Sequence, residues 1–316
     1  LYLLTGLSRR RRLVSQEASV KYFLLGALSS AIFLYGIALV YGAAGSFQLG
    51  IIAQASMTQI SGSKIFAAGM ILLAVGLLFK VGAVPFHNWT PDVYTGAPSP
   101  VTAFMSIATK MVAVLGLMRV MYVALGAMRW DWQLLLAVVA VASMAVGAIV
   151  GLSQTDMKRM LAYSSIAHAG FIMVGVVGAY TLQTGQRPDQ TGSVSSVLIY
   201  LAGYGLATIG FFMVILMVRK AGGESTEIDS WAGLGRRHPM LGALIVLFML
   251  SFAGIPATAG FTGKLFVFLA GWRGGYAWLV LLGVIFSLVA AYFYLHVIYV
   301  VFFKTPGEQA QGVEVG

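Results

Sequence analysis

Residues 241–271 read LGALIVLFMLSFAGIPATAGFTGKLFVFLAG, and this run decides the fold class. It is longer than the roughly 20 apolar residues that a helix needs to cross a bilayer. It contains one charge, Lys264, and one proline, Pro256, which removes a backbone hydrogen bond from a helix interior. In lipid, the carbonyl that such a proline frees has to be satisfied by water or neighbouring protein. The run therefore predicts a membrane-spanning helix that is broken near Pro256 and carries an amine beyond the break.

The whole chain has the composition of a protein whose solvent is lipid. Of its 316 residues, 59% are hydrophobic and only 9% are charged, against about 25% charged in a soluble domain. The mean hydropathy is +0.88. The chain has no cysteine, which excludes disulfides, iron–sulfur ligation and thiolate metal sites, and its four histidines and ten acids leave little for a metal cage. Residues 260–264 (GFTGK) lack the spacing of a phosphate-binding loop, so no nucleotide site is predicted.

Apolar runs long enough to span a bilayer recur along the sequence. The predicted spans are residues 22–43, 65–88, 100–124, 133–153, 160–180, 194–218, 239–270 and 276–303, and residues 1–7 end a further one. This pattern predicts an all-α polytopic membrane protein. Because the chain starts inside an apolar stretch and without methionine, we expect it to be an internal piece of a longer polytopic protein.

The net charge of +10 is distributed unequally between alternate connections. One set holds Arg9–Arg12, Lys21, Lys158, Arg159, Arg219, Lys220, Arg236, Arg237 and Lys304, and the other holds Lys64, Arg129, Arg187 and Arg273. By the positive-inside rule the first set faces the cytoplasm. The basic excess is thus a signal of membrane topology and not of nucleic-acid binding. We expect a multi-pass membrane protein.

Three lysines fall inside the predicted spans: Lys80, Lys110 and Lys264. A charge at the centre of a span costs about 2.5–3.5 kcal/mol, so each is a functional hypothesis, with snorkelling or a structural ion pair as the alternative. All ten acids fall in predicted connections, which leaves these lysines without a counterion. Either they lose their proton, or a carboxylate comes from further sequence or a partner chain. Such an amine can take up and release a proton, which an arginine cannot do.

A second proline, Pro85, also lies within an apolar span. Lys80 precedes Pro85 by five residues, whereas Lys264 follows Pro256 by eight. Paired broken helices in corresponding positions are typical of the ion site of an inverted-repeat transporter. Helix kinks that only improve packing are the alternative, and the reversed order of lysine and proline weakens the repeat argument.

A buried histidine is the fourth candidate for proton transfer. His168 lies in residues 163–170 (YSSIAHAG), about two turns into its span. It could carry protons between the lysines, or it could simply form a hydrogen bond between helices among small residues.

Three long motifs resemble a known family. They are HNWTPDVYTGAPSPVTAF (87–104), KRMLAYSSIAHAG (158–170) and AGIPATAGFTGK (253–264). Together they resemble the antiporter-like subunits of respiratory complex I. The form of the first motif, with SVKYFLLGA (19–27), is similar to the N-type subunit, the counterpart of mitochondrial subunit two. The resemblance covers essentially the whole chain.

The resemblance implies an inverted-repeat helix bundle with two broken transmembrane helices. Such subunits have fourteen helices, ten of them in two inverted five-helix repeats. Residues 1–128 would hold the C-terminal part of the first repeat, from the end of helix 5 to helix 8. Residues 129–316 would hold the second repeat, helices 9 to 13, and the start of the following loop.

The resemblance also assigns roles to the buried lysines. Lys80 takes the position of the lysine on broken helix seven, Lys110 of the connecting lysine on helix eight, and Lys264 of the lysine on broken helix twelve. The glutamate that pairs with the helix-seven lysine would lie just upstream of Leu1.

The implied function is proton translocation by a membrane subunit of NADH:quinone oxidoreductase, a translocase, coupled to quinone reduction in other subunits. This chain would carry no redox centre, and flavin, iron–sulfur clusters and quinone would belong to partner subunits. Its expected partners are the other membrane subunits and the lipid bilayer, and the resemblance implies a location in the bacterial inner membrane. Two other interpretations stay open: a subunit of a secondary cation/proton antiporter, and a purely structural membrane scaffold.

Overall fold

A computed structural model describes residues 1–7, 13–58, 63–179, 190–220, 223–310 and 312–315. Some of the basic residues assigned to connections lie outside the described residues, namely Arg9–Arg12 and Arg187. The helices are α1 (Tyr2–Leu7), α2 (Leu13–Ala44), α3 (Leu49–Thr58), α4 (Lys64–Val81), α5 (Trp89–Gly96), α6 (Ser99–Phe104), α7 (Lys110–Arg119), α8 (Arg129–Gly151), α9 (Met157–Val177), α10 (Gln190–Met217), α11 (Leu234–Arg237), α12 (Pro239–Ala253), α13 (Ala259–Arg273) and α14 (Ala277–Phe302).

Among the described residues, seven helical segments are long and apolar enough to cross a membrane. They are Leu13–Ala44, Lys64–Val81, Ser99–Ala124, Gly126–Gly151, Met157–Val177, Gly192–Met217 and Ala277–Phe302. The remaining predicted span, residues 239–270, is formed by two shorter helices, α12 and α13, with an interruption between them. The all-α polytopic fold is therefore confirmed, including the break at Pro256. The break at Pro85 is confirmed as well, since it separates α4 from α5.

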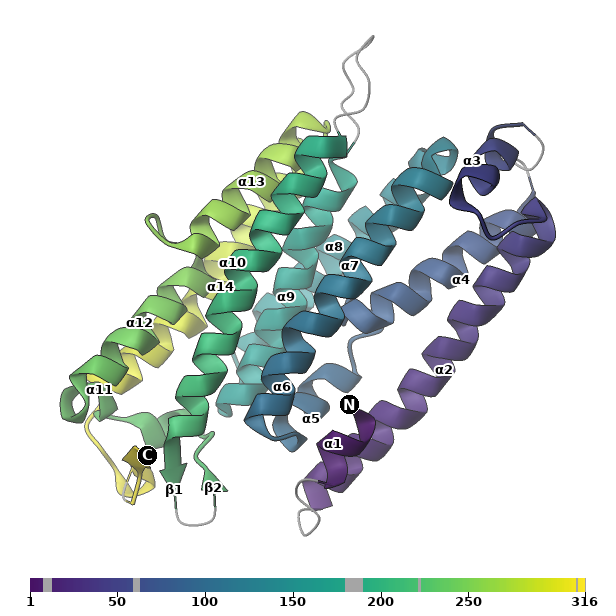
Figure 1. Cartoon of the computed structure of the whole chain (residues 1–316). Coiled ribbons are helices and arrows are strands. Elements are labelled where there is room, and N and C mark those ends of the chain that lie inside the picture. Colours follow the sequence, from purple (N-terminus) through teal and green to yellow (C-terminus); the bar gives the residue numbers. More distant parts are fainter. Residues whose placement is uncertain (8–12, 59–62, 180–189, 221–222, 311, 316) are drawn as a thin grey trace.

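A small sheet at one end of the bundle was not predicted from the sequence. Strands β1 (Val218–Lys220), β2 (Gly223–Glu224) and β3 (Glu314–Val315) are antiparallel, in the order β2-β1-β3. The sheet lies at the same end as α11 (Figure 1). Short strands near turn-rich, charged residues give no hydrophobic alternation, which is why no sequence signal marked them.

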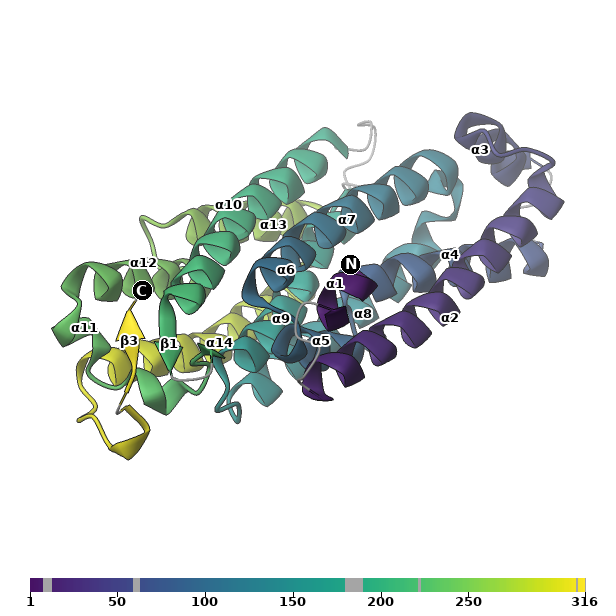
Figure 2. The ribbon, with the colours of Figure 1, turned by 60° about the horizontal axis from the view of Figure 1, so that its bottom comes forward.

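Helix α9 is the central element of the bundle. It packs against α5, α8, α10, α13 and α14, and nearly every residue along it is buried. Figures 1 and 2 both show it enclosed by its neighbours. Apart from Arg159 and Tyr163, the polar side chains on α9 are buried, so they must find partners on the surrounding helices. This helix carries the KRMLAYSSIAHAG motif.

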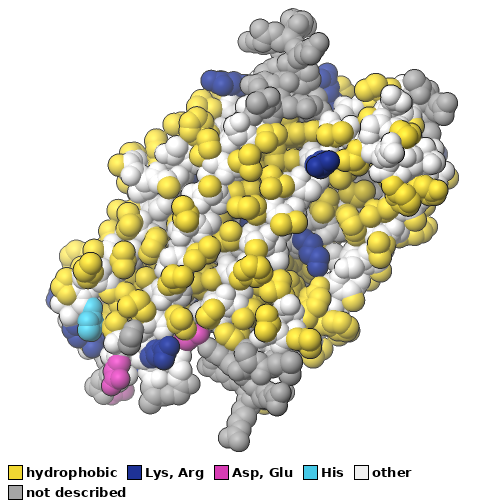
Figure 3. All heavy atoms as spheres, viewed as in Figure 1, with side chains coloured by type: hydrophobic (Ala, Val, Ile, Leu, Met, Phe, Trp, Pro, Cys, Tyr) yellow, Lys and Arg dark blue, Asp and Glu magenta, His cyan; other side chains and the backbone are white. Residues whose placement is uncertain are grey.

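The outer surface between the two ends of the bundle is mostly apolar, although basic side chains also appear in the middle of the viewed face (Figure 3). Figure 3 shows hydrophobic side chains over most of the viewed face, with acidic side chains only at its lower end. On α2, large apolar side chains such as Leu28, Leu34 and Tyr35 are about 60% exposed (59%, 63% and 61%). A soluble protein rarely exposes so much contiguous apolar surface. This surface fits lipid, as the composition predicted.

The connections that carry the first basic set lie together at one end. The start of α9, the sheet, α11 and the end of α14 meet there (Figure 1). Lys64, Arg129 and Arg273 lie at helix ends of the opposite side, because consecutive spans run antiparallel. The alternation of the described basic residues is therefore as predicted.

Three acids lie in α-helices and not in loops, contrary to the expectation: Glu17 in α2, Asp92 in α5 and Asp131 in α8. Asp92 belongs to α5, the second half of a broken span, where its carboxylate is 2.8 Å from Lys21 Nζ and 3.2 Å from Arg159 Nη1. The polar segment 89–96 looked like a connection because its helix is short and its first turn is rich in polar residues. Its ion pairs tie α2, α5 and α9 together at the basic end.

We predict that Gly147→Ala destabilises the protein. A Cβ at Gly147 would lie 2.6 Å from Tyr163 O on α9, so α8 and α9 would have to separate. Overpacking of this kind costs about 1–3 kcal/mol, which exceeds the gain of about 1 kcal/mol that alanine brings to a helix. Gly42→Ala on α2 is the control, because nothing lies within 4 Å of the added Cβ. Thermal unfolding in detergent should show a lower Tm for Gly147→Ala only, and equal Tm values would contradict this packing.

Candidate functional site

The break between α12 and α13 holds the amine of Lys264. Helix α12 ends at Gly254, whose φ of 81° turns the chain out of the helix. This leaves the carbonyls of Phe252 and Ala253 without helical partners. Lys264 Nζ donates to both oxygens at 2.9 Å and to Ser287 Oγ at 2.8 Å. The side chain is buried, at 5% exposure, and a cation at the C-terminal end of a helix is favoured by the helix dipole.

His168 is buried at the middle of α9 with both ring nitrogens occupied. Nδ1 lies 2.6 Å from Tyr200 OH and Nε2 lies 3.2 Å from Tyr294 OH. Tyr294 OH in turn is 2.5 Å from Ser164 Oγ. A tyrosine hydroxyl can donate or accept, so this network can accommodate either neutral tautomer of the imidazole.

Lys110 forms a second polar network on the same central helix. Its Nζ donates to the backbone oxygen of Ser165 at 2.6 Å and to Ser165 Oγ at 2.5 Å. Ser165 Oγ is also 3.4 Å from Tyr94 OH. Lys110 follows directly on a π-helical turn, Met105–Thr109, so its span is unbroken but irregular. Such turns occur frequently at functional sites.

The ring of Tyr204 lies between these two networks. It stacks on His168 with ring centroids 4.4 Å apart, and Lys110 Nζ lies 5.4 Å from the same ring. Lys264 and His168 are linked in a similar way, because both contact the ring of Phe171, at 5.0 and 5.7 Å. The structure therefore brings Lys110, His168 and Lys264 into one buried cluster.

Lys80 lies apart from that cluster. It is in the last turn of α4, half-buried, and its Nζ donates to Tyr2 OH at 3.2 Å. The rings of Tyr2 and Phe79 are 5.7 and 5.8 Å from the amine. None of the described contacts joins it to Lys110, His168 or Lys264.

At the break between α4 and α5, residues other than Lys80 form hydrogen bonds with the backbone groups that the break frees. Gly82 (φ 77°) ends α4, and Trp89 Nε1 donates to Phe79 O at 3.0 Å. Within the break, Val84 N donates to Ser143 Oγ at 2.9 Å. Both proline residues named from the sequence, Pro85 and Pro256, lie in the interruptions themselves.

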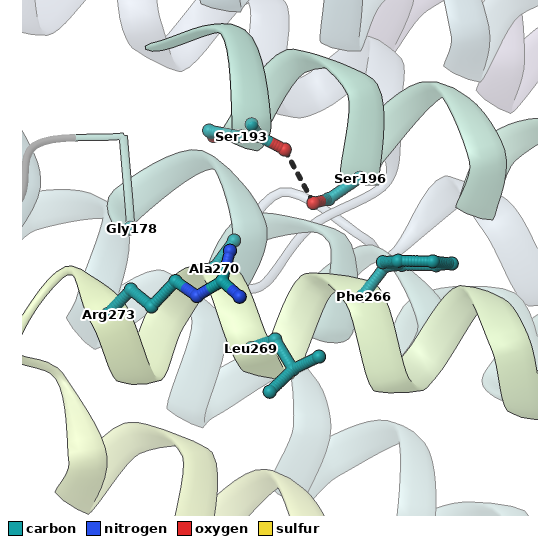
Figure 4. A pocket seen from close by; sticks show the side chains of 8 residues that line it. Gly178, Ser193, Ser196, Phe266, Leu269, Ala270 and Arg273 are labelled. Carbon is teal, nitrogen blue, oxygen red and sulfur yellow. Dashed lines mark hydrogen bonds between the residues drawn. The ribbon is translucent and has the colours of Figure 1, made fainter. Parts of the chain in front are cut away.

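A cavity of about 10 Å³ adjoins the cluster beside the second break. His168, Tyr200, Tyr204, Ser251, Phe252, Gly260 and Gly263 line it. This volume corresponds to about one water molecule. A larger cavity of about 70 Å³ lies at the end of the bundle opposite the sheet, where Ser193 and Ser196 of α10 and Arg273 of α13 line it with apolar neighbours (Figure 4).

The sequence missed the residues that hold the amines in place. Ser165, Ser287, Tyr94, Tyr200, Tyr204 and Tyr2 all contact a candidate residue or its partner. Their only signal was a polar atom inside an apolar span, which many packing residues share. Among the described residues, no group of three His, Asp or Glu side chains could hold a metal ion.

The family described as "NADH:quinone oxidoreductase/Mrp antiporter, TM" matches residues 1–290 of the chain. The chain belongs to this family. The match covers both helix breaks and all four candidate residues, Lys80, Lys110, His168 and Lys264. The resemblance noted from the sequence is thereby confirmed.

Curated relatives carry the name predicted from the motifs. The chain is 73% identical over its full length to "NADH-quinone oxidoreductase subunit N" of Cutibacterium acnes, and 51% identical to the protein of that name from Rhodococcus opacus. It spans 59% and 56% of their lengths. These relatives are bacterial, and with the seven membrane-compatible helices they confirm an integral, multi-pass membrane protein.

Solved structures share the fold. A chain of respiratory complex I from Thermus thermophilus is 36% identical with a TM-score of 0.79, covering 99% of this chain and 64% of that one. A chain of the membrane-bound sulfane sulfur reductase, an archaeal respiratory complex, is 27% identical with a TM-score of 0.81, covering 100% and 61%. A chain of the Mrp complex from Dietzia is 22% identical with a TM-score of 0.83, covering 97% and 55%, and shows the fold alone.

We predict that Gly254→Ala lowers stability more than an equivalent change elsewhere. Its added Cβ would be strained at φ 81° and would lie 2.8 Å from Lys264 Cδ, so the amine would have to leave its two carbonyls. Gly45→Ala is the matched control, because Gly45 has φ 69° and nothing within 4 Å. The unfolding free energy of Gly254→Ala should fall about 1–3 kcal/mol further, the cost of unsatisfied buried polar groups. Equal losses in thermal unfolding would mean that Lys264 does not stabilise the break.

Proposed function

We propose that this chain is part of a proton-translocating membrane subunit of NADH:quinone oxidoreductase. Protons would move through Lys110, His168 and Lys264, with Lys80 serving the first broken helix. The observation that carries the proposal is Lys264 on the carbonyls freed by the break between α12 and α13. There a titratable amine is held inside a membrane span by groups that do not neutralise its charge.

The electrostatics of the three lysines support proton exchange. Among the ion pairs of the described residues, none includes Lys80, Lys110 or Lys264. Their partners are hydroxyls, backbone carbonyls and aromatic rings. For Lys110 and Lys264, which are buried, the charge therefore has no opposite charge beside it, so a change in hydration or in nearby charge acts on it directly.

The names of the relatives support the proposed partners. The curated relatives are named as a subunit of NADH-quinone oxidoreductase, and we propose that this chain likewise assembles with other membrane subunits. Flavin, iron–sulfur clusters and quinone would be bound by those partners. The energy released by quinone reduction would drive the uptake and release of protons by the lysines. The two-repeat division at residues 128/129 belongs to the same proposal.

A secondary cation/proton antiporter shares this fold, so the transported ion needs a direct test. Proton translocation in vesicles that depends on NADH and quinone, without a requirement for sodium, would support the redox-driven subunit. Sodium-dependent transport in the absence of electron transfer would support the antiporter instead.

We predict that Lys80→Ala and Lys264→Ala each reduce proton translocation in the assembled complex by about 10²-fold or more, as expected for a positioned proton-transfer group. Lys264→Arg should not restore it, because a guanidinium keeps its proton. Lys64→Ala, at the surface end of α4, is the control. Proton uptake and quinone reductase activity are measured together. Wild-type translocation in both alanine variants would refute the assignment.

We predict that Lys110→Met slows or uncouples translocation while the protein still assembles. Methionine fills a similar volume without a buried charge, and Lys110→Arg should be at least as harmful because its charge is permanent. Moving a charge across the membrane is worth about 2.3 kcal/mol per 100 mV, so a relay residue must change its proton affinity by a comparable amount. Proton uptake into vesicles is measured for both variants, and assembly of the complex is checked separately. Normal pumping by Lys110→Met would make this lysine a bystander.

A further inference from the structure

A buried ion pair lies at the basic end of the central helix. Lys158 Nζ is 2.8 Å from Glu224 Oε2, and the two side chains are 1% and 5% exposed. The surface pair Lys304–Asp229 near the same end is 40% and 48% exposed. Burying two charges has a desolvation cost that their attraction often fails to repay, so such a pair is weak evidence of a stabilising role. Its presence suggests another role.

The pair is fixed to the start of α6. Lys158 Nζ also donates to Ala97 O at 2.8 Å, and Glu224 Oε1 accepts the backbone N–H of Ser99 at 3.2 Å. The carboxylate therefore touches the first residue of the helix that leads to Lys110.

A stripe of hydroxyls runs from this point to Lys110. Ser99, Thr102, Ser106 and Lys110 follow at spacings of three, four and four, which places them on one face of the helix. They are 0%, 0%, 1% and 3% exposed. Tyr94 joins the same region, because Thr102 Oγ1 donates to Tyr94 O at 3.3 Å and Tyr94 OH is 3.4 Å from Ser165 Oγ, the partner of Lys110.

The first hydroxyl of the stripe has an open hydrogen-bonding position. Ser99 Oγ is fully buried and has no hydrogen bond to any of the described residues. Buried hydroxyls in native proteins are nearly always satisfied, and ordered water is the usual partner where protein atoms are not. This is an independent sign that water binds between the ion pair and the hydroxyl stripe.

We propose that Glu224 and Lys158 form a proton-loading site. Protons would enter there, at the end of the bundle that carries the first basic set, and would pass on to protonate Lys110. This inference rests on the proposed function. Glu224 takes a proton from a hydronium ion of the bulk solvent, so that an O–H bond of the hydronium breaks, one forms on the carboxylate and water is left, while Lys158 stays on Ala97 O. The proton then passes to water at Ser99 and along Thr102 and Ser106 to the free amine of Lys110. The carboxylate that remains pairs with Lys158 again.

The decisive variant is Ser99→Ala in the assembled complex. It removes only the unpartnered hydroxyl and keeps the backbone N–H that Glu224 accepts, so the ion pair and the stability should not change. We expect proton uptake into vesicles to fall about ten-fold, less than the 10²–10⁴ of a direct proton-transfer group because water can bridge part of the gap. Ser29→Ala on α2, a buried hydroxyl away from the stripe, is the matched control.

Glu224→Gln provides the second measurement. It should lower proton uptake at least as much as Ser99→Ala, while Asp229→Asn, a half-exposed carboxylate near the same end, should have no effect. Thermal stability and assembly are measured in parallel, and if Glu224→Gln does not assemble, Ser99→Ala decides alone. Proton uptake at the wild-type level in Ser99→Ala overturns the proposal. The ion pair of Lys158 and Glu224 would then have a structural role only.

The Lys110→Met variant separates this proposal from the proposed function. If Lys110→Met stops pumping while Ser99→Ala and Glu224→Gln pump normally, protons reach Lys110 by another route and only the loading site is refuted. If Lys110→Met itself pumps normally, both the relay and its loading site are refuted.

Discussion

Lipid offers no hydrogen bonds, and this constraint governs the structure. Each backbone carbonyl freed inside the membrane has to be satisfied by the protein itself. At the break between α12 and α13 the amine of Lys264 does this for Phe252 and Ala253. A charged amine has three N–H donors and a neutral amine has two, so loss of the proton removes one of its three hydrogen bonds. The protonation of Lys264 and the geometry of the break are therefore linked.

The two broken helices are not equivalent. At the second break the lysine follows the interruption and reaches back to the helix end, whereas Lys80 precedes its interruption and points instead to Tyr2. The first break is stabilised by Trp89 and Ser143. The reversed order of lysine and proline in the sequence thus has a physical consequence: only Lys264 couples its charge directly to a helix end.

Hydropathy predicted the spans, both interruptions and the buried lysines, because each depends on local sequence and on a solvent that excludes charge. The partners of those lysines depend on contacts between distant segments, such as Lys110 with Ser165, 55 residues apart, and His168 with Tyr294, 126 apart. No local pattern encodes such pairs. Lys158 and Glu224 were assigned to connections for the same reason, since a charged side chain beside a span boundary gives no sign that it is buried.

The buried cluster also limits how protons could cross it. The ring of Tyr204 contacts both Lys110 and His168, its hydroxyl meets Ser165, the partner of Lys110, and the cavity beside His168 has room for about one water molecule. Among the described residues, no hydrogen bond joins the network of Lys110 and Ser165 to that of His168, Tyr200 and Tyr294. Transfer between Lys110 and Lys264 requires either displacement of the Tyr204 ring or further water. If the chain translocates protons as proposed, a path that is closed at rest would prevent protons from leaking through the membrane, and the ring of Tyr204 would be as necessary to the pump as the amines on either side of it.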